Sequence, residues 1–180
     1  MKRLLPLLIF AFAASVSFAQ DDELTPEELA RRGTNLYNAK NYVAAFPLLM
    51  KSAQEGYPFA QYMVGLCSCY GNGIEQNYEE AVKWYRKAAE QGHRASVFRL
   101  AECLYRGKGV PQNLTEAARL LLQEAEQENI KACYLIGRCY RYGDGVDKNI
   151  DEAVKWFEKA AANGDKSAKE SISEIKATGK

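Results

Sequence analysis

The sequence is poor in the groups that most catalytic and metal sites need. It holds one histidine, His93, in 180 residues, and no cysteine–histidine spacing typical of zinc. A single imidazole supports neither a metal centre nor a paired acid–base site, so we expect no metal and no cofactor. The sequence also lacks an excess of charge of one sign, because its 24 basic and 23 acidic residues nearly cancel. The chain therefore has no electrostatic footprint for nucleic acid, and we expect no such partner.

No apolar run is long enough to cross a bilayer, which needs about 20 residues. The longest, residues 4–18, follows Lys2 and Arg3, is broken by Pro6 and ends beside the small residue Ala19. This pattern is typical of a secretory signal peptide cleaved after Ala19. The alternative, a membrane anchor, is disfavoured by the short run and by the acidic residues that follow. We expect an exported protein, periplasmic or secreted, without stable membrane insertion after cleavage.

Glycine pairs recur along the chain at a fixed step of 36 residues. Cysteine, asparagine and alanine residues keep the same step. The columns are Gly71/Gly73, Gly107/Gly109, Gly143/Gly145; Cys67, Cys103, Cys139; Asn77, Asn113, Asn149; Ala81, Ala117, Ala153. A fixed internal period indicates a repeat architecture, in which each unit packs on its neighbours.

Each unit is predicted to be a helical hairpin. The first helix ends at the glycine pair, because glycine accepts the left-handed conformation that ends helices. The second begins at an asparagine followed three residues later by glutamate, as in Asn77 and Glu80, which resembles a capping box. Tryptophans on the second helix, Trp84 and Trp156, are predicted to fill the space between paired helices.

Two segments carry a family resemblance. AQYMVGLCSCYGNGIEQNYEEAVKWYRKAAEQG, from Ala60, and ACYLIGRCYRYGDGVDKNIDEAVKWFEKAAANG, from Ala132, resemble Sel-one-like repeats (SLR), which are relatives of the tetratricopeptide repeat. The resemblance covers about residues 58–165. The middle unit departs most from the pattern, with Ala101 in place of the first-helix glycine and Glu128 in place of the closing glycine.

The resemblance implies an all-α fold: a right-handed α/α solenoid of helical hairpins, a tetratricopeptide-like superhelix, with a C-terminal capping helix. An additional hairpin before the repeats is similar to a tetratricopeptide unit, and Pro47 is expected to bend its second helix or delay its start. The expected organisation is a signal peptide 1–19, a short acidic tail 20–26, a tetratricopeptide-like hairpin 27–57, SLR units 58–93, 94–129 and 130–165, and a capping helix and tail 166–180.

The resemblance also places a binding groove on the concave surface, which first helices line in tetratricopeptide-like stacks. We call the positions that face the ligand in such stacks the predicted groove: Tyr62, Leu66, Cys69, Tyr70, Phe98, Glu102, Tyr105, Arg106, Tyr134, Arg138, Arg141 and Tyr142. Tyrosine and arginine are enriched in binding hot spots, which favours a groove for another polypeptide. The alternative is that these aromatics only pack between helices.

The expected partner is an extended or helical peptide that bears carboxylates and is engaged mainly by the C-terminal half of the groove. Three guanidinium groups, of Arg106, Arg138 and Arg141, can hold carboxylates through paired hydrogen bonds. In the alternative interpretation, the same arginines pair internally with Glu102 and other surface carboxylates.

An enzymatic alternative also comes from the resemblance, because cysteine-rich relatives have been described as penicillin-binding or β-lactamase-like. Ser173 and Lys176 have the Ser-x-x-Lys spacing of that chemistry. The Ser-Asp-Asn element and a Lys-Thr-Gly strand are lacking, so we expect no enzyme. A hydrolase remains the alternative function.

Five cysteines leave at least one thiol unpaired. Cys67, Cys103 and Cys139 are interpreted as small buried hydrophobic residues, although a Cys67–Cys103 or a Cys103–Cys139 bridge remains open. Cysteine-rich relatives pair cysteines about eight residues apart. Cys133 matches the downstream position of such a pair, but Ala125 occupies the upstream one.

Overall fold

The computed structural model describes residues 24–178. This part of the chain consists of nine α-helices of 13 residues each, without strands. They are α2 (Pro26–Asn38), α3 (Tyr42–Gln54), α4 (Pro58–Tyr70), α5 (Tyr78–Glu90), α6 (Arg94–Arg106), α7 (Leu114–Glu126), α8 (Ile130–Tyr142), α9 (Ile150–Ala162) and α10 (Lys166–Thr178). The predicted signal peptide lies outside the described residues.

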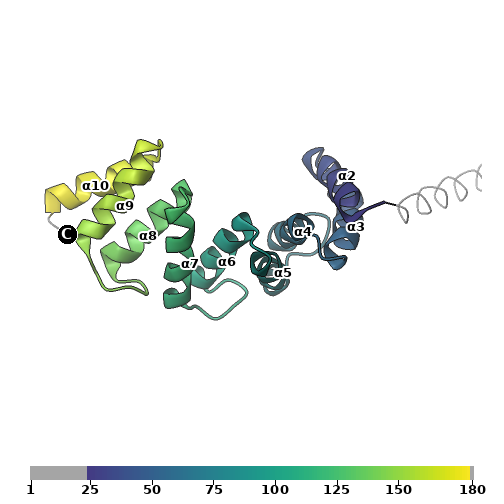
Figure 1. Cartoon of the computed structure of the whole chain (residues 1–180), viewed down its shortest axis with the longest axis horizontal. Helices are drawn as coiled ribbons and strands as arrows, with labels where there is room; N and C mark the ends of the chain where they lie inside the picture. The colour runs from purple at the N-terminus through teal and green to yellow at the C-terminus, as the bar shows by residue number, and fades with distance from the viewer. Residues whose placement is uncertain (1–23, 179–180) are drawn as a thin grey trace, which may run out of the picture.

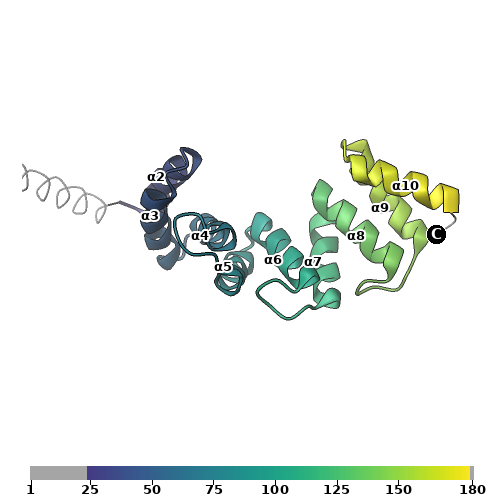
Figure 2. The ribbon, with the colours of Figure 1, turned by 180° about the vertical axis from the view of Figure 1, so that it is seen from behind.

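The helices form an arch (Figure 1), whose two ends, α2 and α10, rise on the same side. Each helix packs mainly on its neighbours in sequence, and α10 closes the array against α9. Seen from behind, the loops after α6 and α8 lie on the lower, convex edge (Figure 2). The all-α repeat solenoid predicted from the sequence is confirmed. No helix within residues 24–178 is long and apolar enough to span a membrane.

In the repeat units, the first helices end at glycines and the second helices begin at asparagines, as the sequence predicted. Gly71 ends α4 in the left-handed conformation, at φ 71°, and its counterparts end α6 and α8 in the same way. The side chain of Asn77 accepts a hydrogen bond from the Glu80 amide at 3.0 Å, which caps α5. The equivalent asparagines cap α7 and α9.

The capping-box interpretation of these asparagines needs a correction. The backbone N–H of Asn77 donates to the carbonyl of Ser68 at 2.8 Å. It is therefore not the donor to a glutamate side chain that a capping box requires. Glu80 pairs with Lys83 instead. A full capping box forms at Thr25 and Glu28, at the start of α2.

The second glycine of each pair lies where one unit contacts the unit before it. Gly73 has φ 81°, and a Cβ atom there would overlap the carbonyl of Tyr42, the first residue of α3. Gly109 and Gly145 lie in the same way on the first residues of α5 and α7. The spacing of the units is therefore set by a close backbone approach that only glycine permits.

Two departures in the sequence have small structural effects. Glu128 occupies the turn position that glycine holds in the neighbouring units, and it adopts the same positive φ, 64°. The helix that contains Pro47 starts at its Asn41 cap, so the proline does not delay its start. Trp84 and Trp156 are buried, with 7% and 8% of their surface exposed, as the prediction of a packing role requires.

Candidate functional site

The predicted groove residues all lie on α4, α6 and α8. Eleven of the twelve are half-buried or exposed. Phe98 is the exception, because only 7% of its surface is exposed and it packs within the hydrophobic core. The prediction that Phe98 faces a ligand is therefore not supported by its position. Among residues 24–178, the large aromatic side chains are most exposed at Tyr70 and Tyr142, with 54% and 57% of their surface accessible.

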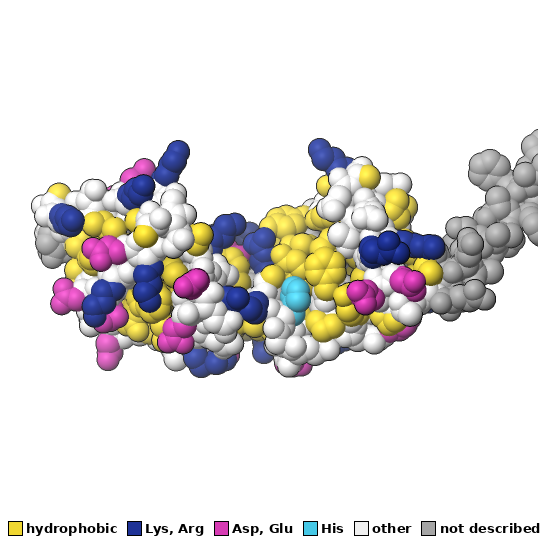
Figure 3. All heavy atoms as spheres, turned by 45° about the horizontal axis from the view of Figure 1, so that its top comes forward, with side chains coloured by type: hydrophobic (Ala, Val, Ile, Leu, Met, Phe, Trp, Pro, Cys, Tyr) yellow, Lys and Arg dark blue, Asp and Glu magenta, His cyan; other side chains and the backbone are white. Residues whose placement is uncertain are grey.

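A cluster of aromatic rings lies in the first SLR unit. The Tyr62 ring is 4.9 Å from the His93 ring and 6.2 Å from that of Tyr85, and Phe59 lies 6.2 Å from His93. Figure 3 shows hydrophobic side chains gathered around this histidine, between the raised ends of the arch. The His93 Nδ1 atom is 2.9 Å from the Ser96 hydroxyl, and burial lowers the pKa of His93.

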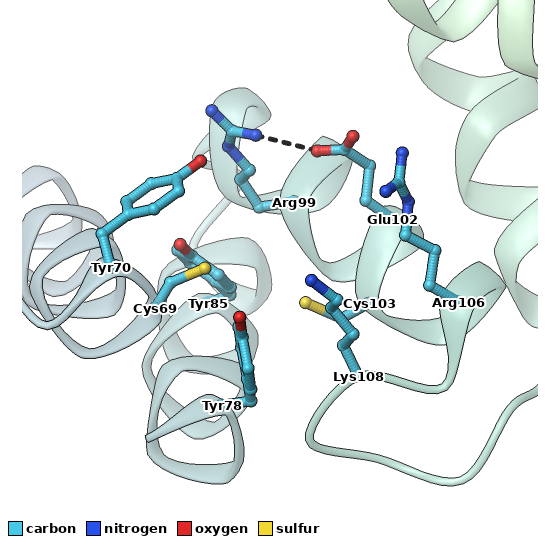
Figure 4. A pocket seen from close by; sticks show the side chains of 9 residues that line it. All are labelled: Cys69, Tyr70, Tyr78, Tyr85, Arg99, Glu102, Cys103, Arg106 and Lys108. Carbon is cyan, nitrogen blue, oxygen red and sulfur yellow. Dashed lines mark hydrogen bonds and ion pairs between the residues drawn. The ribbon is translucent and has the colours of Figure 1, made fainter. Parts of the chain in front are cut away.

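A cavity of about 250 Å³ opens between α4, α5 and α6 (Figure 4). We call it the Tyr85 cavity, and its lining residues are Cys69, Tyr70, Tyr78, Tyr85, Arg99, Glu102, Cys103, Arg106 and Lys108. Four of these belong to the predicted groove. The other five were missed because they come from α5, from the loop after α6 and from positions on α6 that the tetratricopeptide alignment does not assign to a ligand.

The charges in the Tyr85 cavity are partly balanced. Arg99 Nη1 and Glu102 Oε2 form an ion pair of 2.9 Å, which occupies the carboxylate that could have paired with the groove arginines. Lys108 Nζ lies 4.8 Å from the centre of the Tyr78 ring. Arg106 has no ion-pair partner among residues 24–178.

A second cavity, of about 280 Å³, lies between α8 and α10. We call it the Arg138 cavity, and it is lined by Tyr134, Arg138, Arg141, Tyr142, Ser167, Glu170, Ser171 and Glu174. All four groove residues of the last repeat unit contribute to it. The capping helix supplies the remaining wall, a role that the sequence did not indicate.

The two arginines of this cavity have different surroundings. The Arg138 guanidinium lies 6.0 Å from the ring centres of both Tyr105 and Tyr142, and no carboxylate in the described part of the chain pairs with it. Arg141 Nη1, in contrast, pairs with Glu174 Oε2 at 2.9 Å, and only 13% of its side chain is exposed. The internal-pairing alternative thus holds for Arg141 and not for Arg138.

Tyr105 is fixed beside Arg138 by its own hydrogen bond. Its hydroxyl donates to Asp144 Oδ2 at 2.7 Å. Burial, together with this carboxylate, raises the pKa of Tyr105 to about 12. The ring is therefore neutral at ordinary pH and presents a fixed π-face to the guanidinium.

The structure divides the predicted set of three arginines between two cavities. Arg106 lines the Tyr85 cavity, while Arg138 and Arg141 line the Arg138 cavity. A single carboxylate cannot therefore be assigned to all three. The arrangement offers one cationic contact in each of two neighbouring units.

The cysteines show no bridge within the described residues. Cys67, Cys103 and Cys139 are buried, and burial raises their pKa values to about 11, 11 and 12. The Cys133 thiol donates to the carbonyl of Ala125 at 3.6 Å, so these two positions adjoin, as the resemblance implies. No group of three or more potential metal-ligating side chains comes together between residues 24 and 178.

Comparisons with known proteins give a consistent result. A family model described as Sel1 repeat matches residues 58–93, 95–129 and 130–165. The chain is similar to the crystal structure of a Sel1 repeat protein from Oxalobacter formigenes, with 37% identity, a TM-score of 0.75, and coverage of 83% of this chain and 62% of that one. No curated protein matches the sequence.

Two further solved structures are similar. The protein c5321, a protective antigen of uropathogenic Escherichia coli strains with an SLR fold, is 28% identical, with a TM-score of 0.78 and coverage of 83% and 33% of the two chains. Helicobacter pylori cysteine-rich protein B shares the fold at 23% identity, with a TM-score of 0.51 and coverage of 81% and 96%. This chain spans less than two thirds of the length of the first two proteins.

Proposed function

Because the chain belongs to the Sel1 repeat family, whose members are generally scaffolds for protein interactions, we propose that it is an exported, non-enzymatic scaffold that holds a carboxylate-bearing peptide along its concave groove. The observation that supports this proposal most is the environment of the Arg138 guanidinium. Its guanidinium lies 6.0 Å from the centres of two tyrosine rings, and no carboxylate among residues 24–178 forms an ion pair with it. The two rings can make cation–π contacts with the guanidinium while its N–H groups stay available to a ligand.

The exposed aromatics support the same surface. Tyr142 stands beside Arg138, and Tyr70 stands at the Tyr85 cavity, each with more than half of its surface accessible. Tyrosine offers large contact area with only two side-chain torsions, so its ordering on binding costs little entropy. A peptide laid across α4, α6 and α8 would contact both rings. Arg141 would contribute less, because a ligand carboxylate must first replace Glu174.

Export is proposed from the first residues alone. Their basic start, apolar run and small residues at the cleavage point are those of a signal peptide. An export signal places the scaffold in the periplasm or outside the cell.

The hydrolase alternative has weaker support. The Ser173 hydroxyl donates to the Lys169 carbonyl at 3.0 Å, so its proton is not directed toward Lys176. A nitrocefin assay decides between the two functions. We expect no turnover above background, and an activity that disappears in Ser173→Ala would refute the scaffold proposal.

The test of peptide binding uses short fluorescein-labelled peptides rich in tyrosine, leucine, aspartate and glutamate, each paired with its asparagine and glutamine counterpart. Fluorescence polarisation should show tighter binding of the acidic member. Arg138→Gln should weaken that binding by more than about fivefold, which corresponds to about 1 kcal/mol. Arg119→Gln is the matched control, because Arg119 is an exposed arginine on α7 outside both cavities. Equal affinities of wild type and Arg138→Gln would refute the proposal.

A further inference from the structure

The hydroxyl of Tyr85 is a buried polar group without a partner. Only 1% of the residue is exposed, and among the described residues its oxygen makes no hydrogen bond. The Cys69 thiol lies beside the hydroxyl and, after burial, contributes to the raised pKa of Tyr85, but a thiol is only a weak acceptor and the pair does not meet hydrogen-bond geometry. An unpaired buried hydroxyl opposes folding, so its presence asks for an explanation.

Packing does not explain the hydroxyl. The equivalent residues 36 positions apart in the other units are Leu121 and Phe157, and both are fully buried without a polar atom. The rings of Tyr85 and Phe157 lie against equivalent glycines, Gly65 and Gly137, at which a Cβ atom would overlap them. A phenylalanine therefore satisfies the packing at this position, and the oxygen of Tyr85 is additional to it.

The hydroxyl belongs to a cavity with an excess of positive charge. The wall of the Tyr85 cavity carries three cations, Arg99, Arg106 and Lys108, against one carboxylate, that of Glu102. Arg99 is paired with this carboxylate, which leaves Arg106 and Lys108 to attract an anion. Figure 4 shows Tyr85 and Cys69 on one side of the space, with Glu102, Arg106 and Lys108 on the other. Burial raises the pKa of Tyr85, which keeps the hydroxyl protonated and able to donate.

We propose that the Tyr85 cavity binds the C-terminal residue of a peptide, with its carboxylate between the Tyr85 hydroxyl and the Arg106 guanidinium and its side chain against the Tyr70 ring. The volume of about 250 Å³ would hold about eight water molecules, which is room for one residue and not for a chain that passes through. Because the hydroxyl oxygen has no accessible surface, the proposal requires a side chain of the wall, such as that of Cys69, to turn aside before a carboxylate reaches it. This proposal rests on the proposed function, because the C-terminal carboxylate that enters the Tyr85 cavity belongs to the peptide bound in the groove.

The probe for this site is N-acetyl-phenylalanine, which mimics a C-terminal residue, compared with its uncharged amide. Binding is followed by NMR on protein with labelled tyrosine rings, through the signal of Tyr70, which lines the same cavity, is identified by Tyr70→Phe and remains in Tyr85→Phe. We expect a Kd on the order of 1 mM for the acid, as for other small ligands. The amide should bind at least about tenfold more weakly, since a hydrogen bond to a charged group is lost.

The decisive variant is Tyr85→Phe, which removes one oxygen atom and keeps the ring. It should weaken binding of the acid by at least about tenfold and leave the melting temperature equal or higher, because no hydrogen bond is lost on folding. Arg106→Gln should also weaken binding. Affinity of Tyr85→Phe within about twofold of wild type, or equal affinities for acid and amide, would overturn the proposal. Inorganic phosphate that binds as tightly as the acid would also overturn it, since the site would then be a general anion site.

A further variant separates this inference from the proposed function. Arg138→Gln lies in the other cavity, so it should leave binding of N-acetyl-phenylalanine unchanged while it weakens the acidic peptides. If Arg138→Gln acts on the peptides but Tyr85→Phe has no effect on the probe, the scaffold function stands and the C-terminal site is wrong. If Tyr85→Phe weakens binding of the probe while Arg138→Gln leaves the affinity for the peptides unchanged, the C-terminal site stands and the peptide groove is wrong.

Discussion

Replacement of Trp156 by alanine tests whether the repeat alignment describes the core. A tryptophan side chain carries up to about 250 Å² of surface, and Trp156 leaves 8% of its surface exposed. At about 25 cal/mol per Å², its burial contributes at most about 5–6 kcal/mol. Alanine keeps part of this contribution while a cavity adds a cost, so we expect a loss of about 4 kcal/mol in the free energy of unfolding.

Urea unfolding followed by circular dichroism measures the effect. With a slope of about 2–3 kcal/mol per M, the midpoint should fall by about 1.3–2 M. Lys159→Ala is the matched control, because Lys159 Nζ lies 4.0 Å from the centre of the Trp156 ring. Loss of this exposed cation–π contact should cost less than about 1 kcal/mol. A wild-type midpoint for Trp156→Ala would show that the tryptophan column does not carry the core, and the packing argument would fail.

Three further predictions concern single positions. Glu128→Gly should raise the free energy of unfolding by about 1 kcal/mol, since glycine adopts the positive φ of 64° without strain. A melting temperature below that of the wild type would contradict this. Ala125→Cys should form a disulfide with Cys133, whose thiol contacts the Ala125 carbonyl, and thiol titration should then find no free thiol at either position. The lowered pKa of His93 means that folding favours the neutral ring, so its contribution is full above its unfolded pKa of about 6.5 and is lost as pH falls through the folded value. His93→Gln should therefore lose less stability than wild type between neutral and mildly acidic pH, and equal losses would exclude His93 as the cause.

The sequence predicted the features that depend on neighbouring residues. Helix ends at Gly71 and helix starts at Asn77 follow from backbone conformation and capping, which act within one turn, and both are confirmed. The repeat period then placed the same signals in every unit. The family resemblance is confirmed as well, because it rests on those same columns.

Contacts between distant segments could not be predicted in this way. The partner of Arg141 is Glu174 on the capping helix, and that pairing depends on how α10 packs beside α8. Arg99 and Tyr85 were missed as cavity residues because the single-helix alignment ignores side chains from α5 and from intermediate positions on α6. Phe98 was placed in the groove by the alignment, but its side chain is buried in the hydrophobic core.

The backbone contact at Gly73, Gly109 and Gly145 has a consequence for how this architecture changes in evolution. Each glycine lies on a main-chain carbonyl, whether the residue that carries it is Tyr42, Tyr78 or Leu114. A joint made from main-chain atoms does not require matched side chains across it. A gene duplication that adds 36 residues therefore reproduces this backbone contact in the new unit, whichever side chain its neighbour carries at that position. The length of the concave surface can change in whole units, while each unit remains free to acquire its own binding residues.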